Sequence, residues 1–451
     1  MKKEKFEVNN LFYTLNYDDS VTLVSPEGAR EYSGDIVIPK TIEYNGKTLP
    51  VTKIGDLAFD GCEDLKSVDI PNSVTKIGEW AFWGCSGLTS IEFPNSVTSI
   101  GKMALYECTG LTSIKIPNSV TSIGERAFSG CERILSIEIP DSVTEIGERA
   151  FSGCERISSI EIPDSVTSIG EAAFLGCKAL TDINIDIDNP VYASEGGIVY
   201  TKNRGTLLCC PSGRKGSIII PDSVTEIGDN AFCGCSGLTG VTIPDSVTEI
   251  GVGAFCGCSG LTEVTIPNSV TEIGSNAFWD CSGLTSIEIP NSINTIEKET
   301  FGRCRSLICV KFPKLISYIR AGAFSECSSL PSIHIPNSLI SIGEHAFSKC
   351  VNLTNVKIPN SVTEIGADAF SRCRGLVNVE IPDSVTKIGW CAFLECYELT
   401  SVEIPKSVTA IGKWAFAYCS SLKSAVIPSK FMSRKDDIFE NCPNLTDIKA
   451  I

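Results

Sequence analysis

The stretch Leu261–Gly283 reads LTEVTIPNSVTEIGSNAFWDCSG, and most of the 451-residue chain consists of copies of it. One cysteine per copy marks the period of 23 residues, with a single longer step of 58 residues between Cys177 and Cys235. A period of this length is typical of stacked units, each of which buries its apolar face only against its neighbours. The sequence therefore predicts an elongated repeat array rather than several globular domains.

The order of apolar residues within one unit predicts its local structure, when positions are numbered from Leu261. Apolar residues at positions 4 and 6 alternate with polar ones, which favours a short half-buried strand that the proline at position 7 ends. Val270–Ile273 predicts a second extended piece, and Gly274 predicts a turn with positive φ. Ser275–Cys281 opens with a capping residue and spaces its apolar residues as a helix does, which predicts one short helical turn.

The consensus LxxIxIPxSVTxIGxxAFxxCxG resembles the BspA-type leucine-rich repeat, a 23-residue class also found in a treponemal leucine-rich protein, over about residues 51–185 and 218–451. The resemblance implies an α/β leucine-rich-repeat solenoid of about sixteen coils, with parallel β-ladders, short helical turns and the LxxIxIP strands along one face. It also implies an extracellular or cell-surface location, with roles in adhesion and protein binding.

Departures from the repeat predict the boundaries of the remaining segments. We expect a β-rich N-terminal cap at 1–50, repeats at 51–185, a β-hairpin insertion at 186–217, repeats at 218–427 and a capping repeat at 428–451. Within the insertion, GGIVY and TLLCC flank Thr201–Gly205 and predict the hairpin. The insertion is interpreted either as an elaborated coil that stiffens the stack or as a dedicated binding loop.

Charge and composition exclude several classes of function. The net charge of −16 opposes binding to nucleic acid and to anionic lipid. Hydrophobic residues make up 43% of the chain but never form a run long enough to span a membrane. The opening MKKEKFEVNN lacks the apolar region of a secretory signal, so the chain is either cytoplasmic or has lost its signal.

Residues that could carry catalysis are sparse. The two histidines, His334 and His345, occupy different unit positions and are expected to point to different surfaces, so no base is placed to activate a serine. No glycine-rich phosphate loop occurs. The sequence therefore predicts a protein that is not an enzyme and needs no cofactor.

Clusters that could bind a metal are also weak. Cys233, Cys235, Cys256 and Cys258 have the residue type for zinc, but positions 19 and 21 of the unit should face different ways. Asp182–Asp188 lacks the glycine and the late glutamate of a calcium loop. We therefore expect no metal site. Cys233 and Cys256 share one position in neighbouring coils, so an oxidised pair remains open.

Two surfaces are candidates for ligand binding. The fifth position of each unit should form an exposed ladder, whose central members are Glu288, Lys311, His334, Lys357, Glu380 and Glu403. Its three basic members form an island in an acidic strip, although a merely solvated face is the alternative. The rival surface is an edge of tryptophans, Trp80, Trp83, Trp279, Trp390 and Trp414.

These surfaces lead to three functional hypotheses. The first is a non-enzymatic solenoid that binds a protein partner, such as a host extracellular protein. The second is a carbohydrate or cell-wall binding module that uses the tryptophans. The third is a structural spacer. The sequence leaves the oligomeric state open. Glu297 and Arg320, which replace the unit glycine in neighbouring coils, are expected to form a local salt bridge.

Overall fold

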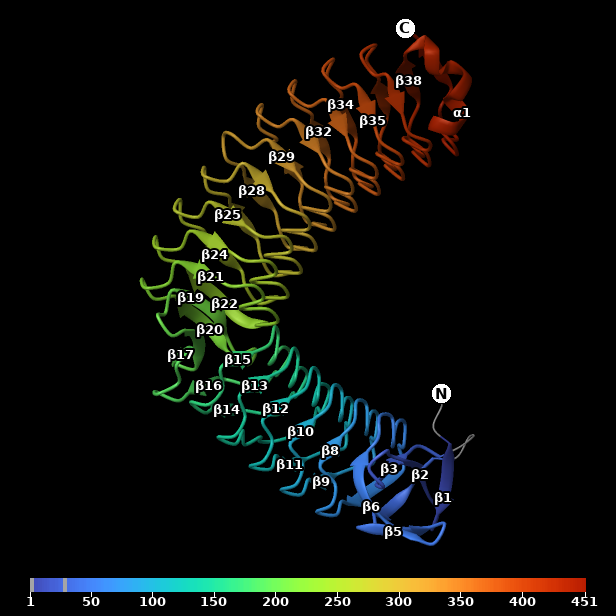
Figure 1. Ribbon diagram of the computed structural model, residues 1–451. Coiled ribbons are helices and arrows are strands. Elements are labelled where there is room, and N and C mark those ends of the chain that lie inside the picture. Colours follow the sequence, from blue (N-terminus) through green and yellow to red (C-terminus); the bar gives the residue numbers. More distant parts are fainter. Residues whose placement is uncertain (1–3, 27–30) are drawn as a thin grey trace. The chain divides into compact units, whose positions relative to one another are not determined.

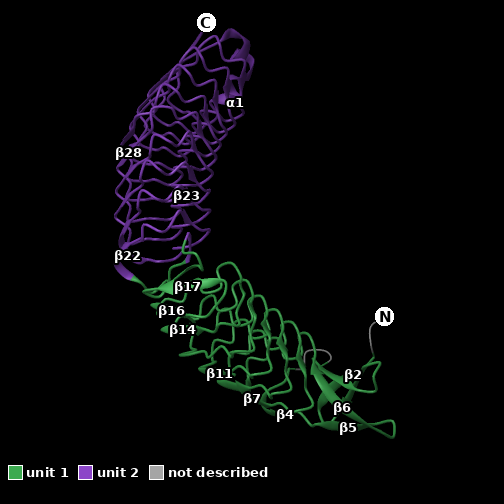
Figure 2. Cartoon of the chain, turned by 60° about the vertical axis from the view of Figure 1, so that its left-hand side comes forward, with its two compact units in different colours: residues 1–204, 209–214 green, residues 205–208, 215–451 purple. Residues whose placement is uncertain are grey.

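The computed structural model describes residues 4–26 and 31–451 and is a β-solenoid of about 17 turns of about 23 residues. The chain divides into two compact units, shown in different colours in Figure 2. Unit 1 comprises residues 1–204 and 209–214, and unit 2 comprises residues 205–208 and 215–451. Most coils contribute a first strand near their leucine and a second, two-residue strand after their proline turn (Figure 1).

Unit 1 begins with strands that precede the regular coils: β1 (Lys5–Val8), β2 (Leu11–Leu15), β3 (Val21–Val24), β4 (Gly34–Val37), β5 (Thr41–Tyr44) and β6 (Lys47–Ile54). The first strands of its coils are β7 (Leu65–Asp69), β9 (Ser90–Glu92), β11 (Ser113–Lys115), β14 (Ser159–Ile162) and β16 (Asp182–Ile185). The second strands are β8 (Lys76–Ile77), β10 (Ser99–Ile100), β12 (Ser122–Ile123), β13 (Glu145–Ile146) and β15 (Ser168–Ile169). The second strands continue the sheet that starts at β1, so the N-terminal strands cover the end of the coil stack.

Unit 2 repeats the same two ladders. Its first strands are β20 (Lys215–Ile219), β22 (Gly237–Thr242), β24 (Glu263–Thr265), β26 (Ser286–Glu288), β28 (Cys309–Lys311), β30 (Ser332–Ile333), β32 (Asn355–Lys357), β34 (Asn378–Glu380), β36 (Ser401–Glu403), β38 (Ser424–Ile427) and β39 (Asp447–Ala450). Its second strands are β21 (Glu226–Ile227), β23 (Glu249–Ile250), β25 (Glu272–Ile273), β27 (Thr295–Ile296), β29 (Tyr318–Ile319), β31 (Ser341–Ile342), β33 (Glu364–Ile365), β35 (Lys387–Ile388) and β37 (Ala410–Ile411). β19 (Thr206–Cys209) lies where the units divide. The pairings between coils are parallel, as the repeat predicted.

The insertion contains an antiparallel hairpin formed by β17 (Tyr192–Glu195) and β18 (Ile198–Thr201), a pairing that the sequence did not suggest. Asn189 anchors its start. The fully buried Asn189 amide donates to the carbonyls of Pro163 and Val166, both at 2.9 Å, and its oxygen accepts from two following backbone N–H groups. These bonds hold the insertion to the preceding coil, which favours the interpretation as an elaborated coil. The five-segment division of the chain remains our proposal.

The segment expected to be a helical turn has a different conformation. In the unit Leu261–Gly283, the N–H groups of Ala277 and Cys281 bond three residues back within the coil, whereas those of Asn276 and Phe278 bond to carbonyls of the next coil. Asn276 has a φ of 58°, and such left-handed residues interrupt a helix. We call these stacked segments the turn stack. The helices in the described residues are η1 (Ser429–Arg434) and α1 (Lys435–Ile438).

Gly274 does not adopt the positive φ that the sequence suggested. A Cβ on this residue would lie 2.6 Å from the nitrogen of Val252 and 2.7 Å from the carbonyl carbon of Gly251 in the preceding coil. The unit glycine is therefore required because two backbones approach closely, which is the other common reason for a glycine.

Glu297 and Arg320 show what happens when this glycine is replaced. The second-strand ladder ends at β25 and resumes at β27, directly before Glu297. The predicted salt bridge is wrong: in the described chain no ion pair joins Glu297 to Arg320, and the Arg320 guanidinium lies 5.2 Å from the centre of the Tyr318 ring. The larger side chain at position 297 thus coincides with a break in the second-strand ladder. At Arg320 the ladder continues, and the Arg320 N–H donates to the Ile296 carbonyl at 2.9 Å.

The core is a column of identical side chains. Phe255 and Phe278 stack with ring centres 5.1 Å apart and planes within 7°. The Cys281 thiol donates to the Phe255 carbonyl at 3.1 Å, and the same carbonyl accepts from the Cys258 N–H at 3.1 Å. These cysteines are small side chains buried in the core. The thiol bond to the preceding coil adds a reason for cysteine that periodicity could not reveal.

Burial should make the core thiols unreactive. Burial raises the pKa of Cys350 to about 12, so almost no thiolate is present at neutral pH. We expect N-ethylmaleimide to modify exposed Cys309 in the folded protein and to leave Cys350 unmodified, as measured by peptide mass spectrometry. Both should react in urea. Equal modification of the two cysteines without denaturant would contradict the buried thiol column.

The close approach at the unit glycine predicts a steric cost for Gly366→Ala. The new Cβ would lie 2.6 Å from the nitrogen of Glu344, so the backbone must shift. Such overpacking costs about 1–3 kcal/mol. The control is Gly257→Ala, where φ is +71° but the nearest atom is 3.7 Å away, so that only the left-handed conformation is penalised. We expect the urea midpoint to fall further for Gly366→Ala, and the reverse order would refute this account.

Candidate binding surfaces

The ladder at the fifth unit position lies on the first strands of unit 2. All six side chains that the sequence singled out are exposed: Glu288, Lys311, His334, Lys357, Glu380 and Glu403. The apolar residues before them, such as Val379 and Val402, are buried. The strand therefore fixes the backbone and leaves each fifth side chain in solvent, as alternation along a strand requires.

Two of the three basic residues in this ladder are neutralised by neighbours. Lys311 lies 3.1 Å from a carboxylate oxygen of Glu288, and Lys357 lies 3.7 Å from one of Glu380. Exposed pairs of this kind contribute at most about 1 kcal/mol each. The expected basic island is thus not a group of unpaired cations. Within residues 4–26 and 31–451, neither His334 nor Glu403 forms an ion pair.

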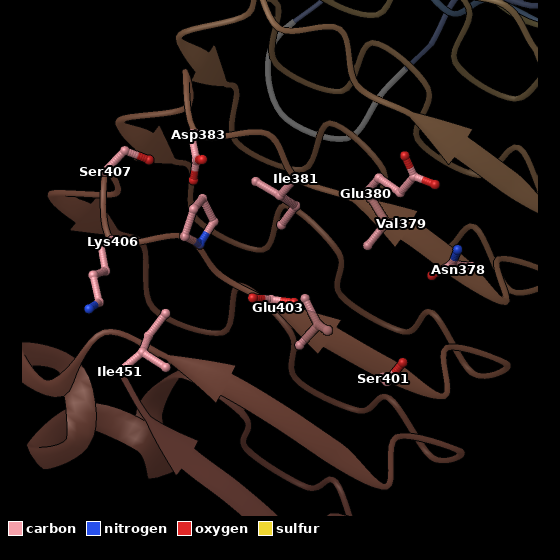
Figure 3. Close-up of a pocket in the computed structure, with 12 residues that line it drawn as sticks. Asn378, Val379, Glu380, Ile381, Asp383, Ser401, Glu403, Lys406, Ser407 and Ile451 are labelled. Carbon is pink, nitrogen blue, oxygen red and sulfur yellow. The ribbon is translucent and has the colours of Figure 1, made fainter.

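A groove runs beside the last part of this ladder. It has a volume of about 810 Å³ and is lined by Glu380 of β34, Glu403 of β36, Asp383 and Lys406 of the following turns, and Ile451. Figure 3 shows Glu403 between the strand residues and Ile451. The lining contains three carboxylates and one lysine, so the groove is acidic. The sequence identified the two glutamates but missed the turn residues at position 8, where Lys406 departs from the usual Asn or Asp.

A second groove on the same face, of about 570 Å³, includes Glu288 together with Asp245 and Glu263. Both grooves lie between the strand side chains and the proline turns. The strand face therefore offers more than a flat polar ribbon.

The turn stack carries a network of ions around Glu326. Its carboxylate lies 2.6 Å from Lys349, 3.5 Å from Arg303 and 3.8 Å from Arg305. The hydrogen bond from Lys349 is the main cause that lowers the pKa of Glu326. This network satisfies charges within the turn stack, so its residues already have partners.

His345 lies in a groove of about 740 Å³ with Asp368, Ser348 and Ser371. A serine, a histidine and an aspartate together prompt the question of a catalytic triad. The closest approach of His345 to Asp368 is 4.0 Å, which is too long for a hydrogen bond. In the described chain no hydrogen bond joins His345 to a serine hydroxyl, so the geometry of nucleophilic catalysis is not met.

The tryptophans lie on the turn stack but do not form one edge. Trp80 donates its ring N–H to the sulfur of Met103, and Trp83 packs edge-on against Tyr106, all in unit 1. In unit 2, the guanidinium of Arg303 lies 4.7 Å from the ring centre of Trp279.

Trp390 and Trp414 come from adjacent coils of unit 2, and their ring centres are 5.8 Å apart at an angle of 26°. Trp390 is 50% exposed, compared with 39% for Trp83 in unit 1. Lys413 covers the Trp414 ring at 4.5 Å. Of the five tryptophans, these two form the pair with an open aromatic surface.

The four cysteines considered for zinc divide between core and surface. Cys235 and Cys258 are buried, and the Cys258 thiol donates to the Phe232 carbonyl at 3.1 Å. Cys233 and Cys256 are half-buried thiols, and a hydrogen bond between them, more than burial, raises the pKa of Cys256. In the described residues no three His, Cys, Asp or Glu side chains could hold a metal together. Cys233 and Cys256 lie next to each other, so their oxidation to a disulfide remains open.

Sequence comparison identifies the repeat. The model of the BspA type leucine rich repeat region matches residues 40–133, 99–192, 212–331 and 317–446. The chain belongs to the BspA-type leucine-rich repeat family. The family resemblance that the consensus predicted is therefore confirmed.

Several solved structures are similar to this BspA-type chain. A leucine-rich repeat protein from Bacteroides ovatus is 28% identical, with a TM-score of 0.53 over 98% of this chain and 100% of that one. The pneumococcal vaccine antigen PcpA is 19% identical, with a TM-score of 0.59 over 100% and 99%. A leucine-rich cell-surface protein from Faecalibacterium prausnitzii is 27% identical, with a TM-score of 0.48 over 91% and 95%. No curated protein matches the chain.

The BspA-type fold places its apolar residues inside the coils rather than on a membrane-spanning helix. Over the described part of the chain, none of the helices has the length and apolar character needed to cross a bilayer.

Proposed function

We propose that this BspA-type protein is a non-enzymatic scaffold that binds another protein, such as a host extracellular protein, at the cell surface. The observation that carries the proposal is the groove of unit 2, whose lining includes the carboxylates of Glu380, Asp383 and Glu403 and the single lysine Lys406. Glu380 is paired with Lys357, which lies outside the groove lining, so Asp383 and Glu403 contribute most of its negative charge. The family resemblance to adhesive surface proteins supports the location and the class of partner.

The groove favours a partner segment with basic side chains. Complementary charges increase the rate of association and select among partners. The ladder residues are held by strands that pair from coil to coil, with Lys357 opposite Glu380 and Glu403 opposite Val426. A surface fixed in this way loses little conformational entropy on binding. The strand face provides few aromatic anchors, so the expected affinity depends strongly on salt.

We also propose that the chain lacks catalytic activity. The support is the His345 groove, where the distance to Asp368 does not allow the hydrogen bond that would orient a catalytic base.

Reversing the groove charges should abolish most of the binding. We expect Glu380→Lys with Glu403→Lys to weaken binding to an array of purified extracellular-matrix proteins by at least tenfold, which corresponds to about 1.4 kcal/mol. The matched control reverses Glu138 and Glu161, which are exposed at the same unit position in unit 1. Unchanged binding by the groove variant, or equal loss in the control, would rule out the strand-face site.

Carbohydrate or cell-wall binding is the second candidate, and the stacked pair Trp390 and Trp414 favours it. Exposed aromatic faces can stack on sugar rings. If this is the function, a glycan array should detect binding that is lost in Trp390→Ala with Trp414→Ala and retained in Trp80→Ala with Trp83→Ala. Absence of binding by the wild-type protein on the glycan array would rule out this candidate. Absence of binding on both the glycan array and the protein array would favour the structural spacer.

A further inference from the structure

Unit 2 exposes apolar side chains at three neighbouring positions of its second-strand face. Leu315 is 72% exposed, Tyr318 of β29 is 38% exposed and Ile340 is 41% exposed. Most coils carry serine at the position of Leu315 and threonine at the position of Ile340. At the position of Tyr318 they carry serine, threonine or a charged residue. We call these three residues the apolar patch.

Backbone register brings the three residues of the apolar patch together. Leu315 and Tyr318 are three residues apart in one coil. Ile340 belongs to the next coil, where its N–H donates to the Ser317 carbonyl at 2.9 Å, and Tyr318 pairs with Ser341 beside it. Single exposed apolar residues are ordinary on protein surfaces, but three on adjoining positions are not.

The apolar patch brings the folded chain no evident stability. At the position of Leu315, the serine of the next coil, Ser338, donates to a carbonyl of the preceding coil at 2.6 Å. At the position of Ile340, Thr386 donates in the same way at 3.1 Å. Leu315 and Ile340 lose these bonds because they have no hydroxyl, and they place apolar surface in water. These two substitutions do not help the chain to fold, but a role in binding would explain them.

The charges around the apolar patch are basic. Lys314 precedes Leu315, and the Arg320 guanidinium lies 5.2 Å from the centre of the Tyr318 ring. Within the described residues, neither Lys314 nor Arg320 forms an ion pair, in a chain whose net charge is −16. Glu297 in the preceding coil is the acidic residue at the unit position of Arg320, and the two form no ion pair in the part of the chain that is described.

We propose that the apolar patch binds a peptide segment of a partner protein that presents apolar side chains flanked by carboxylates. The apolar groups would displace water from Leu315, Tyr318 and Ile340, and the carboxylates would pair with Lys314 and Arg320. This surface lies on the second strands and prefers an acidic ligand, whereas the groove lies on the first strands and prefers a basic one. The proposal does not depend on the groove.

Three fluorescent peptides of equal length test the chemistry by anisotropy with the full chain carrying Glu380→Lys and Glu403→Lys, so that the acidic groove does not bind the basic peptide. One alternates leucine with glutamate, one alternates leucine with lysine, and one alternates serine with glutamate. We expect the leucine–glutamate peptide to bind at least tenfold more tightly than either of the others. Absence of binding by this peptide, or equal binding by the leucine–lysine peptide, would overturn the proposal.

Two variants that restore the usual residues of the repeat locate the binding. Leu315→Ser with Tyr318→Ser and Ile340→Thr should weaken binding at least tenfold without lowering the melting temperature, because the repeat already accommodates these residues. Lys314→Asn with Arg320→Gly should weaken binding and remove its salt dependence. The control, Ile308→Thr with Val377→Thr, removes exposed apolar residues of the first-strand side. Equal loss in the control would overturn the assignment.

A second copy of the chain is the competing occupant of the apolar patch. Sedimentation velocity over a range of concentrations distinguishes it. A monomer at every concentration supports the peptide proposal. Self-association that disappears in the apolar triple variant would assign the patch to a second copy and overturn the proposal.

Discussion

The close stacking of one coil on the next is the constraint on which the rest of the structure depends. Phenylalanine rings stack with centres between 4.8 and 5.8 Å apart, as in the pairs Phe232–Phe255 and Phe151–Phe174. Alternate N–H groups of the turn stack bond to the next coil, and the unit glycine leaves room for the backbone beside it. Each coil forms hydrogen bonds with the backbone polar groups of its neighbour. Residues that face outward are therefore not needed for stacking and can vary.

The sequence predicted the strands well, since the apolar positions of Leu261–Gly283 recur without a shift and a one-residue slip would expose them. It failed at the turn stack. Asn276 and Asp280 have positive φ values although neither is glycine, whereas Gly274 has none. Periodicity reveals which side chains are buried, but it does not distinguish a helical turn from consecutive tight turns. The sequence also cannot distinguish a glycine that lets two backbones pack closely from a glycine that adopts a positive φ.

The candidate sites were only partly predictable. Glu380 and Glu403 were identified because they vary along an exposed ladder, but their groove also requires turn and C-terminal residues such as Asp383 and Ile451. The pairing of Lys311 with Glu288 depends on side-chain reach across one coil, so a linear list of charges could not reveal it. Trp390 and Trp414 stack because position 15 of one coil lies beside position 16 of the next. Such contacts depend on how the coils are aligned in three dimensions.

Residues that differ from the repeat consensus can be interpreted by comparison with the other coils. Most coils carry a hydroxyl that bonds to the neighbouring coil, so a leucine or an isoleucine at that position removes a bond and adds exposed apolar surface. Glu297 is the opposite case, because it replaces a residue that the stacking needs and coincides with the break between β25 and β27. Departures on the surface point to function, whereas departures at the coil contact weaken the stack.

Amide hydrogen exchange, resolved by residue along unit 2, tests the dependence on coil stacking most directly. If coil-to-coil bonds hold the array, the amides of Asn276 and Phe278 exchange as slowly as those of the paired strands, and exchange is fastest within the array at Thr295–Glu297. Fast exchange throughout the turn stack, or uniform protection across the break at Glu297, would contradict the account.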